Sequence, residues 1–199
     1  MATGTRFILL MHPMEWRREK CATGRITSLN LANSEIIPGL GFDDQSRVRE
    51  LVENPDNFPI LLYPGEGAMN VSEGGFPKLA LGTRRLVVFL IDATWACARV
   101  VARSSPGLMR LPRLMFTPRE KSRWVIKRQP ADYCLSTLEA CHELLLALEE
   151  AGLDRYPDKE RLLAVFARMQ SYQVERATRD RRPRRPGGSF GIPGPGAAT

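Results

Sequence analysis

Residues 85–95 read Arg-Leu-Val-Val-Phe-Leu-Ile-Asp-Ala-Thr-Trp, with six apolar residues in succession before Asp92. A run that is apolar at every position is typical of a strand buried on both faces, as in a parallel sheet covered by helices. Ligands of open α/β sheets bind just beyond the carboxyl ends of such strands. The stretch therefore predicts an interior strand with a ligand site at Asp92. These residues alone equally allow an aspartate that only caps the following helix.

The rest of the chain predicts further strands and helices of an α/β fold, with a mostly parallel sheet covered by helices. Short apolar runs predict strands at Phe7 to Met11, Ile60 to Tyr63 and Arg113 to Phe116. Apolar residues at helical spacing predict helices at Thr23 to Ser34, Arg47 to Glu53, Thr137 to Ala151 and Leu162 to Tyr172. Residues 68–84 lack periodicity and contain Gly74-Gly75, so we expect a surface loop there.

The length of 199 residues predicts one domain, residues 1–175, followed by a basic tail, residues 176–199. Six arginines lie between Arg176 and Arg185, and Gly, Pro and Ala dominate the remainder, which we expect to be disordered. The arginines are either solvated or a phosphate-binding arm.

The formal net charge is +7 and the pI about 9.6. This balance favours a polyanionic partner, a nucleic acid before a membrane. No apolar run approaches the roughly 18 residues of a membrane span, and Phe7 to Met11 is too short for a signal peptide. The four cysteines lack the spacing of a zinc site. We therefore expect free thiols, no metal and a cytoplasmic location.

Three strand ends are each followed by a short loop and a helix start, namely Tyr63-Pro64-Gly65, Asp92 to Trp95, and Gln129 to Thr137. In a parallel sheet these loops gather on one edge, where Trp124 to Ile126 is also expected to lie close. Ser136 and Glu139 have the spacing of a capping box, which explains both residues without any chemistry.

Three motifs follow one another along the chain: His12-Pro13-x-Glu15, Asp92-x-Thr94-Trp95, and Ser136-Thr137-Leu138-Glu139-Ala140, the last preceded by Arg128-Gln129-Pro130. In this order they resemble the DTW-domain family, over roughly residues 6 to 150. Its members are tRNA-uridine aminocarboxypropyltransferases and relatives, similar in fold to the SPOUT class of knotted RNA-modifying enzymes. The resemblance implies a SPOUT-like domain with a C-terminal knot near residues 85 to 140.

The chemistry that the resemblance implies is transfer of the 3-amino-3-carboxypropyl group of S-adenosylmethionine to N3 of a uridine in tRNA, releasing methylthioadenosine. Asp92 is the expected catalytic residue, as a base toward N3 or as an electrostatic stabiliser. The donor's carboxylate would meet Arg128 or the helix start at Ser136. Residues expected to bind the donor are Tyr63, Pro64, Gly65, Thr94, Trp95, Arg128, Gln129, Ser136, Thr137, Leu138 and Glu139.

RNA contacts are expected at His12, Glu15, Arg17, Arg18, Arg25 and Arg84, although the arginines are equally compatible with a solvated surface. Trp16 and Trp124 either stack on bases or pack within the protein. Two other functions remain open: a SPOUT-type RNA methyltransferase, and a basic RNA-binding protein without catalysis. Ribosomal RNA is an alternative substrate to tRNA.

Overall fold

A computed structural model describes residues 1–18, 22–126 and 134–179. Arg128, Gln129 and residues 180–199 of the expected tail lie outside these ranges, as does part of the stretch in which the knot was expected. No helix in the described part of the chain is long and apolar enough to cross a membrane.

The centre of the fold is a six-stranded sheet in which every pair of neighbouring strands is parallel. The strands are β1 (Arg6–Met11), β2 (Ser34–Pro38), β3 (Asn57–Leu62), β4 (Met69–Asn70), β5 (Arg85–Asp92) and β6 (Arg113–Met115). Their spatial order is β2-β1-β5-β3-β6-β4. The apolar run is therefore an interior strand between β1 and β3, which confirms the prediction made from it.

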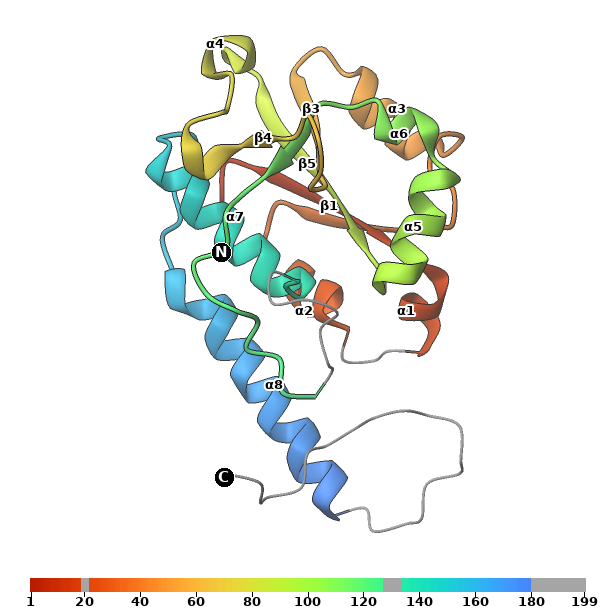
Figure 1. Ribbon diagram of the computed structural model, residues 1–199, viewed down its shortest axis with the longest axis vertical. Helices are drawn as coiled ribbons and strands as arrows, with labels where there is room; N and C mark the ends of the chain where they lie inside the picture. Colours follow the sequence, from red (N-terminus) through yellow and green to blue (C-terminus); the bar gives the residue numbers. More distant parts are fainter. Residues whose placement is uncertain (19–21, 127–133, 180–199) are drawn as a thin grey trace.

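Helices cover both faces of the sheet (Figure 1). One face carries α2 (Thr23–Asn30), α7 (Thr137–Glu150) and α8 (Lys159–Arg179), and the other carries α3 (Ser46–Glu53), α5 (Trp95–Arg103) and α6 (Pro106–Met109). The shorter elements are α1 (Pro13–Arg18), the 3₁₀ turn η1 (Val71–Glu73) and α4 (Lys78–Leu81).

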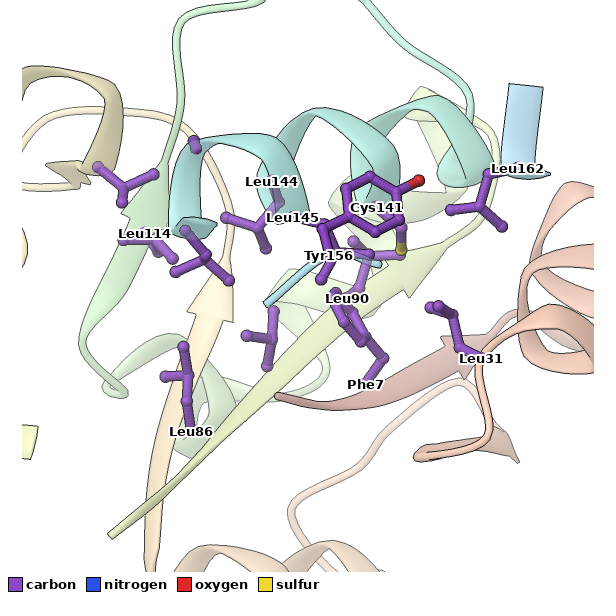
Figure 2. Close-up of a cluster of buried hydrophobic side chains, with 14 of the residues drawn as sticks. Phe7, Leu31, Leu86, Leu90, Leu114, Cys141, Leu144, Leu145, Tyr156 and Leu162 are labelled. Carbon is purple, nitrogen blue, oxygen red and sulfur yellow. The ribbon is translucent and has the colours of Figure 1, made fainter. Parts of the chain in front are cut away.

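Alternating side chains of the strands divide the core in two. Leu86, Val88 and Leu90 of β5 pack toward α7 and α8, while Val87 and Phe89 pack toward the helices on the other face. Figure 2 shows the first cluster, in which Cys141, Leu144 and Leu145 of α7 lie over the sheet. A strand buried on both sides needs no polar positions, which is why its sequence is apolar throughout.

Two sequence predictions were wrong in detail. The helix predicted for Thr23 to Ser34 ends at Asn30, and Ser34 instead begins the edge strand β2. The prediction rested on the spacing of Ile26, Leu29 and Leu31. This spacing was misleading, because Leu29 is 85% exposed and only Leu31 of the three is fully buried.

The expected surface loop at residues 68–84 contains β4, η1 and α4. A strand of two residues is too short to produce any periodicity. The last helix, α8, continues to Arg179, so residues 176–179 are helical, and the boundary between domain and tail stays a prediction.

Candidate functional site

A cavity of about 390 Å³ opens at the carboxyl ends of β3, β5 and β6, beside the start of α7. Its size is within the range of small-molecule sites. The wall residues are Leu62, Tyr63, Pro64, Leu90, Ile91, Ala93, Ala98, Met115, Phe116, Pro118, Leu135, Thr137 and Ala140. Among these described residues only Tyr63 and Thr137 have side-chain hydroxyls. The cavity therefore suits a largely apolar ligand held by a few polar contacts.

Asp92 ends β5 beside this cavity and is 5% exposed. The Thr137 hydroxyl donates to Asp92 Oδ1 at 2.5 Å. A Cβ added at Gly24 would overlap the Asp92 carboxylate, so the first turn of α2 approaches it closely. Asp92 is thus held between the amino ends of α2 and α7, where negative charge is favoured. It does not line the cavity, whereas its neighbours Ile91 and Ala93 and its partner Thr137 do.

Cys141 also lies near this carboxylate. Burial raises the pKa of its thiol, and the negative charge of Asp92 raises it further. The thiol therefore remains protonated at neutral pH and is a poor nucleophile.

The N-cap of α5 is Thr94 and not Asp92. Its hydroxyl accepts a hydrogen bond from Cys97 N at 3.3 Å and begins α5. The interpretation of Asp92 as the cap of the next helix is therefore wrong. Trp95 is the first residue of α5.

Some residues of the Ser-Thr-Leu-Glu-Ala motif line the cavity, and the others stabilise the helix and the core beside it. Thr137 and Ala140 line the cavity, while Leu138 is fully buried in the core. Ser136 and Glu139 form the predicted capping box, with Ser136 Oγ accepting from Glu139 N at 3.3 Å and Glu139 Oε2 accepting from Ser136 N at 2.9 Å. Leu138, Ser136 and Glu139 do not line the cavity, so their observed contacts position its wall.

Glu139 also binds the segment that follows β6. Its carboxylate accepts from Ser122 Oγ at 2.8 Å and from Arg123 N at 2.6 Å. Gln170 of α8 continues this attachment, since its Oε1 accepts from Val125 N at 2.7 Å and its Nε2 donates to Arg123 O at 3.1 Å. Residues 122–125 are thereby fixed to α7 and α8, a short distance along the chain from the wall residues Phe116 and Pro118.

Tyr63 and Pro64 form the wall beyond the end of β3, whereas the next residue, Gly65, does not line the cavity. Gly65 has a φ of 138° and Gly67 a φ of 75°, conformations that favour glycine. Arg113 of β6 donates to Glu66 O, and its guanidinium lies near both glycines. Sequence reasoning missed Arg113, and also Met115, Phe116, Pro118 and Leu135 in the wall, because none of them belongs to a motif.

The expected RNA-binding residues do not form one cluster. His12 is buried, with its backbone N–H donating to Asp92 O at 3.0 Å and its Nδ1 accepting from Met14 N at 3.2 Å. It therefore joins β1 to α1 beside the site. Arg17 is exposed on α1, and Glu15 is partly exposed there. Arg84 precedes the amino end of β5, at the opposite edge of the sheet, where its guanidinium lies 4.7 Å from the centroid of the Phe58 ring.

The two tryptophans considered as stacking residues have different surroundings. Trp124 packs edge-on against Phe166, with ring centroids 5.5 Å apart, and is part of the core. It does not line the cavity. Trp16 is 39% exposed and carries the Arg25 guanidinium over its ring.

Comparison with known proteins places this geometry in context. The family profile described as DTW domain matches residues 1–174. A Drosophila melanogaster protein named tRNA-uridine aminocarboxypropyltransferase 2 is 29% identical over 153 residues, which are 74% of this chain and 58% of that protein. The Mus musculus protein of the same name is 28% identical over 173 residues, 86% of this chain and 55% of that protein. The chain thus spans a little over half the length of these two curated relatives. No solved structure gives a significant match.

Proposed function

The chain belongs to the DTW domain family, and from this premise we propose that it transfers the 3-amino-3-carboxypropyl group of S-adenosylmethionine to N3 of a uridine in tRNA. Methylthioadenosine is the second product. The names of the Drosophila and mouse relatives support this activity. The observation that carries it is the apolar cavity at the carboxyl edge of the sheet, where Tyr63 follows β3, Ile91 lies at the end of β5 and Thr137 begins α7.

The wall residues fit S-adenosylmethionine as donor substrate. Apolar side chains suit its adenine, and the hydroxyls of Tyr63 and Thr137 supply polar contacts. The amino end of α7, where Thr137 is the first helical residue, favours the donor's carboxylate. Arg128 and Gln129, also expected to bind the donor, lie outside the described residues.

The proposed reaction forms a bond between N3 and a carbon of the donor and breaks the bond between that carbon and sulfur. The N3 proton would pass to the Thr137 hydroxyl while the Thr137 proton passes to Asp92, and the sulfonium becomes a neutral thioether. Asp92 would act on this reaction through Thr137. Because the Thr137 proton is donated to Asp92, the lone pairs of the hydroxyl oxygen remain available to accept from a substrate N–H in the cavity.

Product analysis tests the proposal against both alternatives. Purified protein incubated with S-adenosylmethionine and bulk tRNA should release methylthioadenosine. S-adenosylhomocysteine would instead indicate a SPOUT-type methyltransferase, and RNA binding without either product would indicate a non-catalytic binding protein. Parallel incubation with ribosomal RNA distinguishes the two RNA substrates.

The proposal has two finer parts. A SPOUT-like knot near residues 85 to 140 is supported by the all-parallel sheet, and an experimental structure covering residues 127–133 would test it. A cytoplasmic location is supported by the free thiols of Cys97, Cys134 and Cys141.

A further inference from the structure

We propose that Trp16 and Arg25 form a stacking platform for an unpaired RNA base, on the side of Asp92 opposite the donor cavity. This inference rests on the proposed function, because it names the part of the site that receives the nucleobase. Unpaired bases are recognised by stacking on aromatic rings and on arginine guanidinium planes. Trp16 provides an aromatic ring and Arg25 provides a guanidinium plane.

The two side chains are held together across two helices. Arg25 Cζ of α2 lies 4.1 Å from the centroid of the Trp16 ring of α1, and the Arg25 guanidinium donates to Trp16 O. A cation over an indole face is a favourable pair. The contact restricts the orientation of both groups before any ligand binds. Since Trp16 is still 39% exposed, part of its aromatic surface remains accessible.

The position of the pair connects it to the reacting groups. Trp16 N donates to His12 O at 3.0 Å, and His12 N donates to Asp92 O at 3.0 Å. Trp16 therefore lies one helical turn beyond the residue that is bonded to the Asp92 main chain. On α2, Arg25 directly follows Gly24, whose Cα faces the Asp92 carboxylate. Figure 1 shows α1 beside the ends of β1 and β5.

The sheet order places the platform and the cavity on different sides of β5. The platform follows β1, which is one neighbour of β5, whereas the cavity lies over β3 and β6 on the other side. Asp92 and Thr137 lie between them. A base on the platform and a donor in the cavity would thus approach each other across these two residues, as a transfer to a base nitrogen requires.

Salt-dependent RNA binding tests the platform, because stacking and phosphate contacts respond differently to salt. Stacking of one base contributes about 1–3 kcal/mol, so Trp16→Ala should weaken binding of a uridine-rich single-stranded RNA by about 5- to 150-fold. The slope of log affinity against log salt should stay unchanged. Trp16→Phe should restore most of the affinity, since an aromatic face remains. Arg17→Ala, which removes an exposed cation on the same helix, should instead reduce the slope by about one.

The matched control is Met14→Ala, which changes a 51% exposed apolar residue on the same short helix. Its RNA affinity should equal that of the unchanged protein. Calorimetric binding of S-adenosylmethionine should be the same for the unchanged protein and for Trp16→Ala, which shows that the cavity is intact.

Two outcomes would overturn the platform: equal RNA affinity of Trp16→Ala and the unchanged protein, or loss of donor binding together with RNA binding. Either result leaves the proposed function standing as long as the unchanged protein releases methylthioadenosine. Absence of that product would instead remove the proposed function, while the RNA affinities would still decide whether Trp16 stacks.

Discussion

The hydroxyl of Thr137 donates to the buried carboxylate of Asp92 at 2.5 Å, and of the two residues only Thr137 lines the cavity. The negative charge is thus one hydrogen bond away from the ligand site. In the proposed reaction Asp92 would accordingly act on the substrates through a neutral group whose orientation it determines.

Replacing Asp92 by Asn should reduce transfer by about 10²-fold or more, while donor affinity stays within several-fold. The amide oxygen can still accept from Thr137, but an amide cannot take up the proton that leaves N3. Thr137→Val, which removes the hydroxyl and keeps the shape, should also impair turnover, and Thr137→Ser should largely preserve it. Single-turnover release of methylthioadenosine measures the effect. Near-normal turnover of the Asn variant would reassign Asp92 to a structural role.

Gln170→Met should destabilise the protein by about 1–3 kcal/mol, because Val125 N and Arg123 O each lose a hydrogen-bond partner. Hydrogen exchange at the Val125 amide should accelerate as well. Gln173→Met on the same helix is the matched control and should change neither quantity. Denaturant unfolding and exchange measured by NMR provide the two readings. Unaltered exchange at Val125 in the Gln170 variant would contradict the attachment of this segment to α8.

Burial lowers the pKa of His142, whose Nδ1 lies 2.9 Å from Tyr156 Oη. The unfolded chain therefore binds a proton at higher pH than the folded protein does, and stability should fall as the pH drops through about 6.5. The charged groups that act on the ring are Glu160, Arg123, Arg119 and Glu139.

His142→Asn should flatten this decline between pH 7 and pH 5. Glu35 does not confound the test, because Arg47 lowers its pKa, and the stability contributed by this carboxylate is lost only as the pH falls below about 4.5. Unfolding titrations across the range supply the comparison. Parallel pH profiles for both proteins would show that His142 is not responsible.

Removal of residues 180–199 should weaken RNA binding and reduce its salt dependence. The removed segment carries Arg181, Arg182, Arg184 and Arg185. If three or four of them meet phosphates, the slope should fall by roughly three units. Truncation after Arg179 leaves α8 entire, so thermal stability and donor affinity should not change. Identical slopes for both proteins would locate the phosphate contacts on the folded domain.

Short sequence patterns correctly predicted β5 and the start of α7, because each pattern reflects the environment or contacts of residues that are close together in the sequence. The apolar run predicted β5 because a strand buried on both faces has no polar positions, and Ser136 with Glu139 predicted the start of α7 because a capping box is completed within four residues. The contacts of Glu139 with Ser122 and Arg123 join residues 16 and 17 positions apart, which no local pattern reveals.

Most residues of the cavity wall could not be predicted from short sequence patterns either. Phe116 ends a predicted strand, but Pro118 and Leu135 lie in segments without a pattern, so the wall could be assigned only once the tertiary contacts were known. The pairing of Trp16 with Arg25 similarly depends on how α1 and α2 pack, whereas the sequence shows only that both residues lie near the His-Pro motif.

The strand order also has a consequence for how the chain matures during synthesis. Both neighbours of β3, β5 and β6, follow it in the sequence, so Phe58, Ile60 and Leu61 leave the ribosome before any strand is available to pair with them. About thirty residues separate the ends of β3 and β5, which translation at 5–20 residues per second supplies in about 2–6 seconds. During that interval an apolar strand with two open edges is exposed to other nascent chains. Slower translation between the emergence of β3 and that of β5 should therefore increase aggregation and dependence on chaperones, whereas slower translation after β6 has emerged should not.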